Sequence, residues 1–533
     1  MTNQNSEFSN QEFVWWRNGI IYQIYPRSFA DANGDGVGDL PGITAKLDYL
    51  QWLGVDAIWL SPIYPSPLAD FGYDVSNYHD IDPAFGSLAD FDRLVSAAHA
   101  RGLRIVLDMV MNHTSDQHAW FVESRSSRDN PKRDWYIWRD PKNGREPNNW
   151  ESVFGGKAWQ FDERTGQYYL HLFVPEQPDL NWRNPQVKEA LFSECAFWLE
   201  RGVDGFRLDV AHMFVKPIDL PDNPIKFGLR GYDRQDHLQH INLPETHVVW
   251  KEFRQLLNRY PERAAVGEVD PIGAVGYYGQ GDDELHLVFN FAMLRRSWDA
   301  RGFYKVIEAW ENQLPDGAWP CWTLNNHDNT RSITRYASGT VTEARAKVAA
   351  TMLLTLRGTP FLYYGEEIGL REGRIPRNEI LDPPGRKYWP IYKGRDGCRT
   401  PMHWDASINA GFSKARPWLR VNPDYTTINV EAERRDPQSL LNTYRALIAL
   451  RRESPALQRG TYRALNRPID VFAYEREYEG QRMLIALNFF SRPATLRLDG
   501  AWQLRLSSEH RPMAAFAFEM RLMPNEAIVL EKL

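Results

Sequence analysis

Eight short apolar segments alternate with segments of helical spacing, and this alternation constrains the fold more than any other feature of the sequence. The apolar segments are typical of buried strands, and they are Gly19–Phe29, Ala57–Pro62, Arg104–Val110, Gly205–Ala211, Ala264–Val269, Leu285–Phe291, Trp319–Asp328 and Thr359–Glu366. The predicted helices between them are Leu40–Leu53, Leu88–Ala100, Gln186–Arg201, His247–Tyr260, Phe303–Leu314 and Thr342–Leu356. Strands of this kind, each followed by a helix or a long connection, predict a parallel sheet. Eight such units favour an α/β fold, the (β/α)8 TIM barrel, over a doubly wound open sheet.

Two long stretches interrupt the alternation. Residues 112–182 are rich in Asn, Asp, Arg, Trp and Gly and show no helix pattern, so they predict a small inserted domain after the third strand. Within it, Tyr168–Phe173 alternates as a strand does. A second long connection, about 368–435, follows the eighth strand, and Gln438–Arg452 reads as the helix that closes the barrel.

The last part of the chain changes from helical to period-two spacing. Runs such as Asp470–Tyr474 and Met483–Phe489 predict a C-terminal antiparallel β-sandwich domain. We therefore predict a catalytic barrel over 1–111 and 183–457, an inserted substrate-pocket domain over 112–182 and a β-sandwich over 458–533.

Charge and composition exclude several classes of function. Lys and Arg number 63 and Asp and Glu 69, giving a net charge of −6, which argues against a nucleic-acid binder or a protein held on anionic lipid. No apolar run is long enough for a membrane helix, and the polar start of the chain predicts no signal peptide. We expect a cytoplasmic protein that is a monomer or a weak homodimer. The 20 Trp, 24 Tyr and 26 Phe fill cores, and such rings also stack on sugars.

Ionisable residues follow several of the predicted strands, where TIM barrels carry their active sites. Asp108 ends the third strand, Arg207 and Asp209 end the fourth, Glu268 the fifth, and His327 and Asp328 the seventh. A single carboxylate at a strand end is a solvated or salt-bridged loop residue about as often as it is part of a site. Three in apolar runs indicate a site, because each is costly to place there unless it is paired or used.

Paired carboxylates without a metal cluster suit the cleavage of a glycosidic bond, which needs a nucleophile or base and a proton donor. Asp209 lies two residues after Arg207, so both side chains point to the same side of the strand. We expect the arginine to keep Asp209 ionised, as a nucleophile requires. The apolar neighbours of Glu268 suit a general acid.

Four segments resemble the signature regions of the α-amylase superfamily of glycoside hydrolases, in the family's order. They are Asp108-Met-Val-Met-Asn-His113, Gly205-Phe-Arg-Leu-Asp-Val210, Val266-Gly-Glu-Val269 and Asn326-His-Asp328. Gln177-Pro-Asp-Leu-Asn181 and Arg399-Thr-Pro-Met402 with Trp404 resemble its α-glucosidase and oligo-1,6-glucosidase branch. The resemblance covers essentially the whole chain.

This resemblance implies a retaining mechanism on α-glucosides. Asp209 would be the nucleophile, Glu268 the acid and base, and Asp328 the stabiliser of the transition state. The same glucose would be held by His113, Arg207 and His327.

The resemblance also implies a pocket closed at one end, so that one glucose is removed at a time from the non-reducing end. Tyr73 would stack on that glucose, and Asp70 would pair with a late arginine, for which we expect Arg399, with Arg395 as the neighbouring candidate. Phe154 and Phe173 resemble aromatic walls near the scissile bond, and an ordinary core role is equally open for them.

The expected activity is therefore an exo-acting α-glucosidase on short α-1,4- and α-1,6-linked oligosaccharides. A transglucosylase or sucrose isomerase on the same scaffold is the alternative, although the Arg-Leu-Asp-Arg-Asp type of motif associated with sucrose isomerases is absent. A non-catalytic transporter subunit is disfavoured because all three carboxylates are present. Val210 resembles the oligo-1,6-glucosidase form, but the segment after it departs from that pattern.

A loop after the first strand alternates oxygen-bearing side chains with glycines, a pattern that can wrap a hard cation. The alternative is an ordinary turn rich in Asp and Asn, without a bound ion. The resemblance implies one structural Ca²⁺, with Mg²⁺ possible, held away from the chemistry by Asp31, Asn33, Asp35, Asp39 and the Val37 carbonyl.

Overall fold

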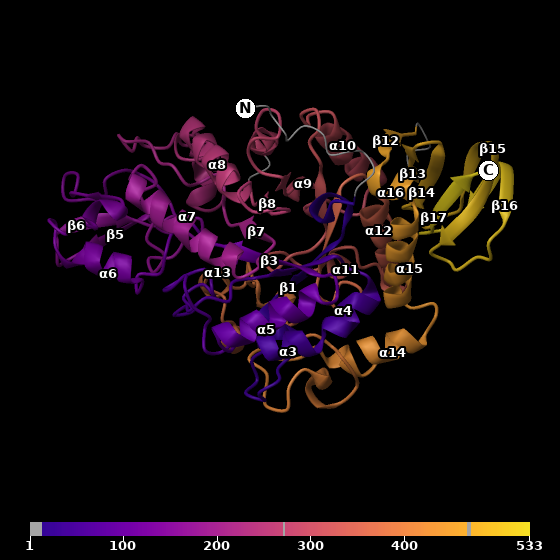
Figure 1. Cartoon of the computed structure of the whole chain (residues 1–533), viewed down its shortest axis with the longest axis horizontal. Helices are drawn as coiled ribbons and strands as arrows, with labels where there is room; N and C mark the ends of the chain where they lie inside the picture. Colours follow the sequence, from indigo (N-terminus) through magenta and orange to yellow (C-terminus); the bar gives the residue numbers. More distant parts are fainter. Residues whose placement is uncertain (1–12, 270–271, 466–470) are drawn as a thin grey trace.

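Eight parallel strands form the predicted barrel at the centre of the computed structural model, which describes residues 13–269, 272–465 and 471–533 (Figure 1). Their order is β10-β11-β1-β2-β3-β7-β8-β9. A parallel bridge between Phe289 and Cys321 joins β9 to β10 and closes the circle. The strands are β1 (Ile21–Ile24), β2 (Ala57–Leu60), β3 (Arg104–Met109), β7 (Gly205–Leu208), β8 (Ala264–Gly267), β9 (Leu287–Val288), β10 (Cys321–Thr323) and β11 (Thr359–Tyr363).

The inward faces of these strands change from apolar to polar toward their C-terminal ends. Side chains such as Ile21, Trp59 and Val106 form a buried cluster that fills the barrel. Because successive side chains alternate between the two faces of a strand, the inward positions continue into polar residues at the strand ends. These are Gln23, Ser61, Asp108, Arg207, Asp209 and Glu268. The strand period thus brings the ionisable groups to one end of a filled barrel.

Helices cover the outside of the barrel, close to the predicted segments. Polar caps begin several of them: Ser87 and Asp90 form a capping box at α5, and Asn184 and Asp299 cap α7 and α10. The segment predicted as one helix over Leu40–Leu53 is divided at Lys46 into two. The covering helices are α3 (Leu40–Ala45), α4 (Leu47–Leu53), α5 (Leu88–His99), α7 (Pro185–Glu200), α8 (Pro244–Leu257), α10 (Ala300–Glu311), α12 (Thr342–Thr355) and α15 (Leu440–Glu453).

The segment between β3 and α7 carries a small sheet of its own, in the order β4-β6-β5. Its strands are β4 (Trp138–Arg139), β5 (Trp159–Asp162) and β6 (Gln167–Leu170). It also contains α6 (Ala119–Ser126), so the expectation that this region holds no helix was wrong. Phe121 is the one large apolar side chain that α6 buries, which explains why its spacing shows no apolar face.

The C-terminal part forms one antiparallel sheet in the order β12-β13-β14-β17-β15-β16, at the opposite end of the molecule from the inserted sheet (Figure 1). One face joins the main core, and the other carries a second cluster that includes Leu484, Trp502 and Leu530. Asp470 of the predicted first run lies outside the described residues. The strands are β12 (Thr461–Ala464), β13 (Val471–Tyr478), β14 (Gln481–Asn488), β15 (Ala494–Ser507), β16 (Ala515–Leu522) and β17 (Ala527–Lys532).

Short helices occupy the connections. They are α1 (Trp15–Asn18), α2 (Pro26–Phe29), α9 (Phe291–Leu294), α11 (Ser332–Arg335), α13 (Pro383–Tyr388), α14 (Val430–Arg435) and α16 (Pro455–Arg459). Within the described ranges, no helix combines the length and the apolar character needed to cross a membrane.

Candidate active site

A cavity of about 370 Å³ opens at the C-terminal end of the barrel and collects most of the predicted site residues. All three predicted catalytic carboxylates line it. The predicted substrate-binding residues that line it are Asp70, Tyr73, His113, Phe154, Phe173 and His327. Arg207 and Arg399 do not line the cavity; both are buried, and they contact it through the carboxylates they hold.

Arg207 lies at the centre of three carboxyl groups. Its Nη1 donates to Asp108 Oδ1 at 2.7 Å and to Asp209 Oδ1 at 2.8 Å, and its Nη2 contacts Glu268. Burial raises the pKa of Asp209 and the neighbouring carboxylates add to this, while Arg207 opposes them. The effect expected of Arg207 on Asp209 is therefore present, but burial and the neighbouring carboxylates oppose it.

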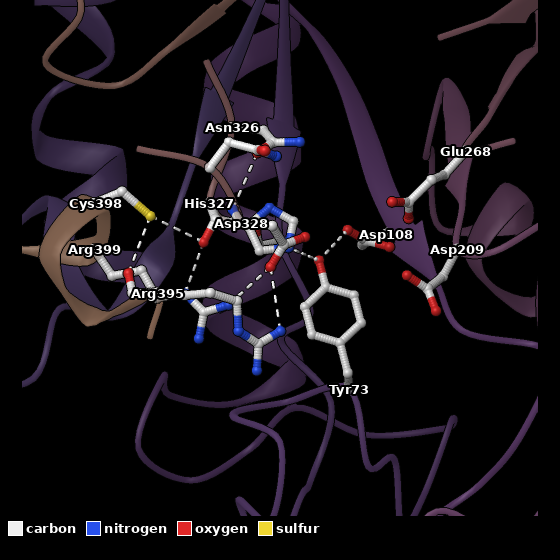
Figure 2. Close-up of polar contacts among 12 residues, drawn as sticks. Tyr73, Asp108, Asp209, Glu268, Asn326, His327, Asp328, Arg395, Cys398 and Arg399 are labelled. Carbon is white, nitrogen blue, oxygen red and sulfur yellow. Dashed lines mark hydrogen bonds and ion pairs between the residues drawn. The ribbon is translucent and has the colours of Figure 1, made fainter. Parts of the chain in front are cut away.

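Tyr73 connects this cluster to the end of the seventh barrel strand. Its hydroxyl lies 2.9 Å from Asp108 Oδ2 and 2.7 Å from His327 Nε2. Burial raises the pKa of Asp108 to about 6 and lowers that of His327 to about 3. His327 is therefore neutral over the physiological range. Figure 2 shows Tyr73 and Asp108 between Asp328 on one side and the carboxylates of Asp209 and Glu268 on the other.

The arginine that pairs with Asp70 is Arg395, which corrects our expectation of Arg399. Arg395 Nη2 contacts Asp70 Oδ1 at 2.5 Å, and its other nitrogens contact Asp382 at 2.6 Å and Asp328 at 3.2 Å. Arg399 instead donates to Asp328 at 3.0 Å and to the His327 carbonyl at 2.8 Å (Figure 2). The two arginines lie one turn apart in a short helix of tight geometry, Asp396–Arg399 preceded by Arg395, so they reach different partners. Burial would raise the pKa of Asp328, but His327 and both arginines outweigh it and hold that pKa below its usual range.

The inserted segment supplies one wall of the cavity. Phe154 and Phe173 contact each other edge to face, with centroids 5.5 Å apart, and the guanidinium of Arg395 lies 5.0 Å from the Phe154 ring centroid. His113 packs against Phe173 at 5.1 Å and lies 3.0 Å from Gln177 Nε2. Gln177 also donates to the Tyr73 carbonyl at 3.0 Å. The segment that carries Gln177 thus contacts Tyr73 and His113 at the wall of the cavity.

Several lining residues were not singled out from the sequence: Val153, His212, Met213, Tyr232, Phe291, Arg295, Asn329 and Tyr392. Position after a strand end was an available signal for His212, Met213 and Asn329, which follow Asp209 and Asp328 closely. Tyr232 and Tyr392 come from long connections, where the sequence carries no local signal for the cavity.

Backbone strain is present beside two functional positions. Val210, directly after Asp209, has φ of 37°, and Leu68 and Phe71 on either side of Asp70 have φ of 67° and 50°. Left-handed backbone is unfavourable for such side chains and is found where the surrounding structure imposes it, often at active sites.

The loop predicted to hold a cation turns its oxygens onto its own backbone. Asp31 accepts hydrogen bonds from Gly34 and Gly36, and Asp35 accepts one from Val37. Asp39 accepts from Ala32, Asn33 and Gly42, and it caps α3. In the described part of the chain, no three His, Cys, Asp or Glu side chains gather as a metal site would require. The carboxylate oxygens of Asp31 and Asp35 each accept one hydrogen bond and keep a further lone pair, which suits a hard cation such as Ca²⁺, whereas Asp39 Oδ2 already accepts two.

A buried carboxyl group beyond the end of β11 gives a prediction on stability. Burial raises the pKa of Glu366 from 4.5 to about 7, while Tyr444 at 2.9 Å donates to it. The folded protein therefore binds a proton that the unfolded chain has lost between these two pH values, so the group's contribution to stability falls as pH rises through this window. Gln does not titrate, so Glu366→Gln does not lose this contribution as the pH rises. The unfolding free energy of the variant minus that of wild type should therefore increase by about 3 kcal/mol from pH 4.5 to pH 8.

Urea unfolding of both proteins at pH 5 and pH 8 measures this difference, with the exposed Glu509→Gln as control. An equal difference between Glu366→Gln and wild type at both pH values would contradict the prediction.

Comparisons with known proteins agree with the site. Residues 23–460 match the family model described as "Alpha amylase, catalytic domain". A probable alpha-glucosidase of Rhizobium meliloti (strain 1021) is 44% identical, and the match covers 93% of each chain. An oligo-1,6-glucosidase of Parageobacillus thermoglucosidasius is 42% identical over 97% of this chain and 99% of its own. The crystal structure of the alpha-glucosyl transfer enzyme XgtA superposes with a TM-score of 0.93, at 42% identity over 98% of this chain and 100% of that one.

Proposed function

The chain belongs to the α-amylase catalytic-domain family of glycoside hydrolases, and within it we propose a retaining, exo-acting α-glucosidase. The substrates proposed are short α-1,4- and α-1,6-linked gluco-oligosaccharides or α-glucosides. One observation carries the proposal: Asp209 and Glu268 line a cavity that is also lined by the buried ion pair of Asp70 and Arg395, which we propose closes one end of it. A pocket closed in this way accepts the end of a chain and not its middle.

The reaction consists of two displacements. Asp209 attacks the anomeric carbon and forms a β-glucosyl ester, while Glu268 gives a proton to the leaving oxygen and the glycosidic bond breaks. Glu268, now ionised, takes a proton from water, whose oxygen attacks the same carbon and displaces Asp209. Two inversions release glucose in the α configuration.

The other buried groups hold the glucose and the charge that develops on it. Asp328 carries its negative charge beside the cavity, held by Arg395 and Arg399, and that charge favours a positively charged sugar ring in the transition state. Tyr73 offers a ring face for stacking on the sugar, and His113 and His327 offer ring nitrogens to its hydroxyl groups.

The first experiment follows the products from maltose, isomaltose and sucrose over time by NMR, with the anomer of released glucose recorded. α-Glucose from maltose or isomaltose is the expected result. Release of β-glucose, or no release from any of the three, would overturn the roles of Asp209 and Glu268.

The choice of linkage is proposed to depend partly on Val210, which lines the cavity beside the nucleophile. Removing two methyl groups at such a position is expected to change discrimination by about 1–3 kcal/mol. Val210→Ala should therefore lower the ratio of kcat/KM for isomaltose to that for maltose about tenfold or more. An unchanged ratio would direct attention to the following loop, which contributes His212 and Met213.

A dedicated transglucosylase or sucrose isomerase remains the alternative, and the likeness to the alpha-glucosyl transfer enzyme favours testing it. Hydrolysis and glucosyl transfer share the glucosyl-enzyme step and differ in whether water or a sugar accepts the glucosyl group. The ratio of released glucose to released fructose from sucrose decides between them, because a hydrolase gives equal amounts.

We also propose that the loop of Asp31, Asn33, Asp35, Val37 and Asp39 binds one Ca²⁺ that stabilises the fold. Adding Ca²⁺ to chelator-treated protein should then raise the melting temperature, since a ligand that binds only the folded state stabilises it. Asp35→Asn should abolish this rise, whereas the exposed Asp80→Asn should not. No rise in the wild type would refute the Ca²⁺ site. The proposed monomer or weak homodimer is tested by sedimentation of the same samples.

A further inference from the structure

A buried glutamine touches the site from inside the barrel. Gln23 lies in β1 on the same inward face as Ile21, and it is 1% exposed. Its Nε2 is 2.8 Å from His327 Nδ1 and 3.1 Å from Ser61 Oγ. An amide nitrogen can only donate hydrogen bonds, so His327 Nδ1 must accept.

This contact fixes where the imidazole carries its proton. A neutral imidazole that accepts at Nδ1 bears its hydrogen on Nε2. That nitrogen lies 2.7 Å from the Tyr73 hydroxyl and 3.1 Å from Asp328 Oδ2. Tyr73 in turn donates to Asp108 Oδ2 at 2.9 Å. The donors therefore run in one direction, from Gln23 through His327 and Tyr73 to Asp108, and Figure 2 shows the last three of these groups together.

Two tyrosine rings also contact the imidazole. The His327 ring stacks on Tyr25, with centroids 6.1 Å apart, and on Tyr73, with centroids 5.2 Å apart. The charged groups that act on it are Asp328, Arg207, Arg395 and Arg399, and burial keeps it neutral. The position of the single ring proton then depends on the groups that contact the two ring nitrogens, and Gln23 is the one at Nδ1.

Gln23 makes this contact at a cost to its own hydrogen bonding. Its Oε1 is buried and has no hydrogen-bond partner among the residues that the structure describes. An unpaired buried acceptor is unfavourable and calls for an explanation. A residue kept only to fill the barrel would be apolar at this depth, as Ile21 and Trp59 are on the same inward surface.

We propose that Gln23 is a positioning residue: its amide holds His327 in the Nε2–H form, so that this N–H is directed toward the Tyr73 hydroxyl and Asp328 Oδ2 at the cavity. The proposal rests on the glucosidase function proposed above. Gln23 itself does not line the cavity, so it acts on the substrate only through His327.

Three variants test this role. Gln23→Met keeps the length of the side chain but cannot donate, and kcat/KM should fall about 10- to 100-fold. Gln23→Glu offers an acceptor to Nδ1, which then takes a proton, so the ring becomes an imidazolium or turns its Nε2 lone pair toward Asp328. Its kcat/KM should show a new decline toward alkaline pH that wild type and Gln23→Met lack. Ser61→Ala removes only the second partner of the amide and should retain most activity.

A direct measurement of the tautomer separates this proposal from the proposed function. In protein labelled with ¹⁵N-histidine, NMR distinguishes protonated from unprotonated ring nitrogens, and His327→Asn assigns the signal. We expect an unprotonated Nδ1 in wild type and a protonated Nδ1 in Gln23→Glu. A protonated Nδ1 in wild type would overturn the proposal whether or not the enzyme cleaves glucosides. Equal losses with identical pH profiles in Gln23→Met and Gln23→Glu would do so as well, since they would indicate a packing role alone.

Discussion

Replacing Asp209 by Asn is expected to reduce kcat at least about 10⁴-fold on every substrate, including those with good leaving groups. The amide cannot form the glucosyl ester, so neither displacement can begin. The hydrogen bond from Arg207 Nη1, at 2.8 Å from Oδ1, can be retained by the amide oxygen, and the variant should therefore keep its fold. Steady-state kinetics with maltose and with an aryl α-glucoside measure the loss, and circular dichroism checks the fold.

Glu268→Gln should behave differently, because the group it loses is the proposed proton donor. The loss in kcat should be about 10²–10⁴-fold for substrates whose leaving oxygen needs a proton. It should be much smaller in the first step with α-glucosyl fluoride, whose leaving group needs little protonation. Similar losses for Asp209→Asn and Glu268→Gln across all leaving groups would contradict the division of roles.

The stereochemistry of rescue identifies the two faces of the sugar. Added azide should attack in place of the missing nucleophile in Asp209→Gly and give a β-glucosyl azide. In Glu268→Ala it should attack the glucosyl ester and give the α-glucosyl azide. Asp219→Asn, an exposed position on the loop after the nucleophile, is the matched control and should leave kcat unchanged. The opposite stereochemistry in either variant would exchange the assignments.

The barrel and the place of its carboxylates could be predicted because both follow from the strand period. Asp108 and Glu268 lie two residues beyond the inward Val106 and Val266, and Asp209 lies two residues beyond the inward Arg207, so the strand period directs all three into the barrel mouth. The first strand is shorter than we predicted, for a local reason. Pro26 begins a short helix directly after β1, and this ended a segment that we expected to continue to Phe29.

The partner of Asp70 could not be predicted in this way. Arg395 and Arg399 lie four residues apart in one connection, and only the turn between them decides which guanidinium reaches Asp70. The same holds for Tyr232 and Tyr392, which long connections bring to the cavity from opposite parts of the chain. Where the fold has no repeating period, residue type indicates the chemistry but not the contact.

Replacing Arg395 by Met is expected to have the largest effect outside the catalytic pair. Arg395 holds Asp70, Asp328 and Asp382, and its own pKa is raised because these three carboxylates outweigh its burial. Asp70 and Asp382 are 4% and 0% exposed, so removing the guanidinium leaves buried charges without the cation that contacts them. We expect a loss of about 3–5 kcal/mol in unfolding free energy. The kcat/KM should fall about 100-fold or more, because the closed end of the pocket and Asp328 both lose their support.

A double-mutant cycle separates the wall from general destabilisation. Asp70→Asn removes one of the charges that Arg395→Met would leave unpaired, so the double variant should be more stable than the sum of the single losses predicts, by about 0.5–3 kcal/mol. The same cycle with Arg399→Met should show weaker coupling to Asp70, since the closest carboxylate of Arg399 is Asp328, at 3.0 Å. Coupling of Asp70 to Arg399 as strong as that to Arg395 would instead restore the pairing that the sequence favoured. The products formed from longer α-glucans give a second measurement. If Arg395→Met opens the end of the pocket, the enzyme should cleave inside these chains. A variant that has lost only stability should still release single glucose units.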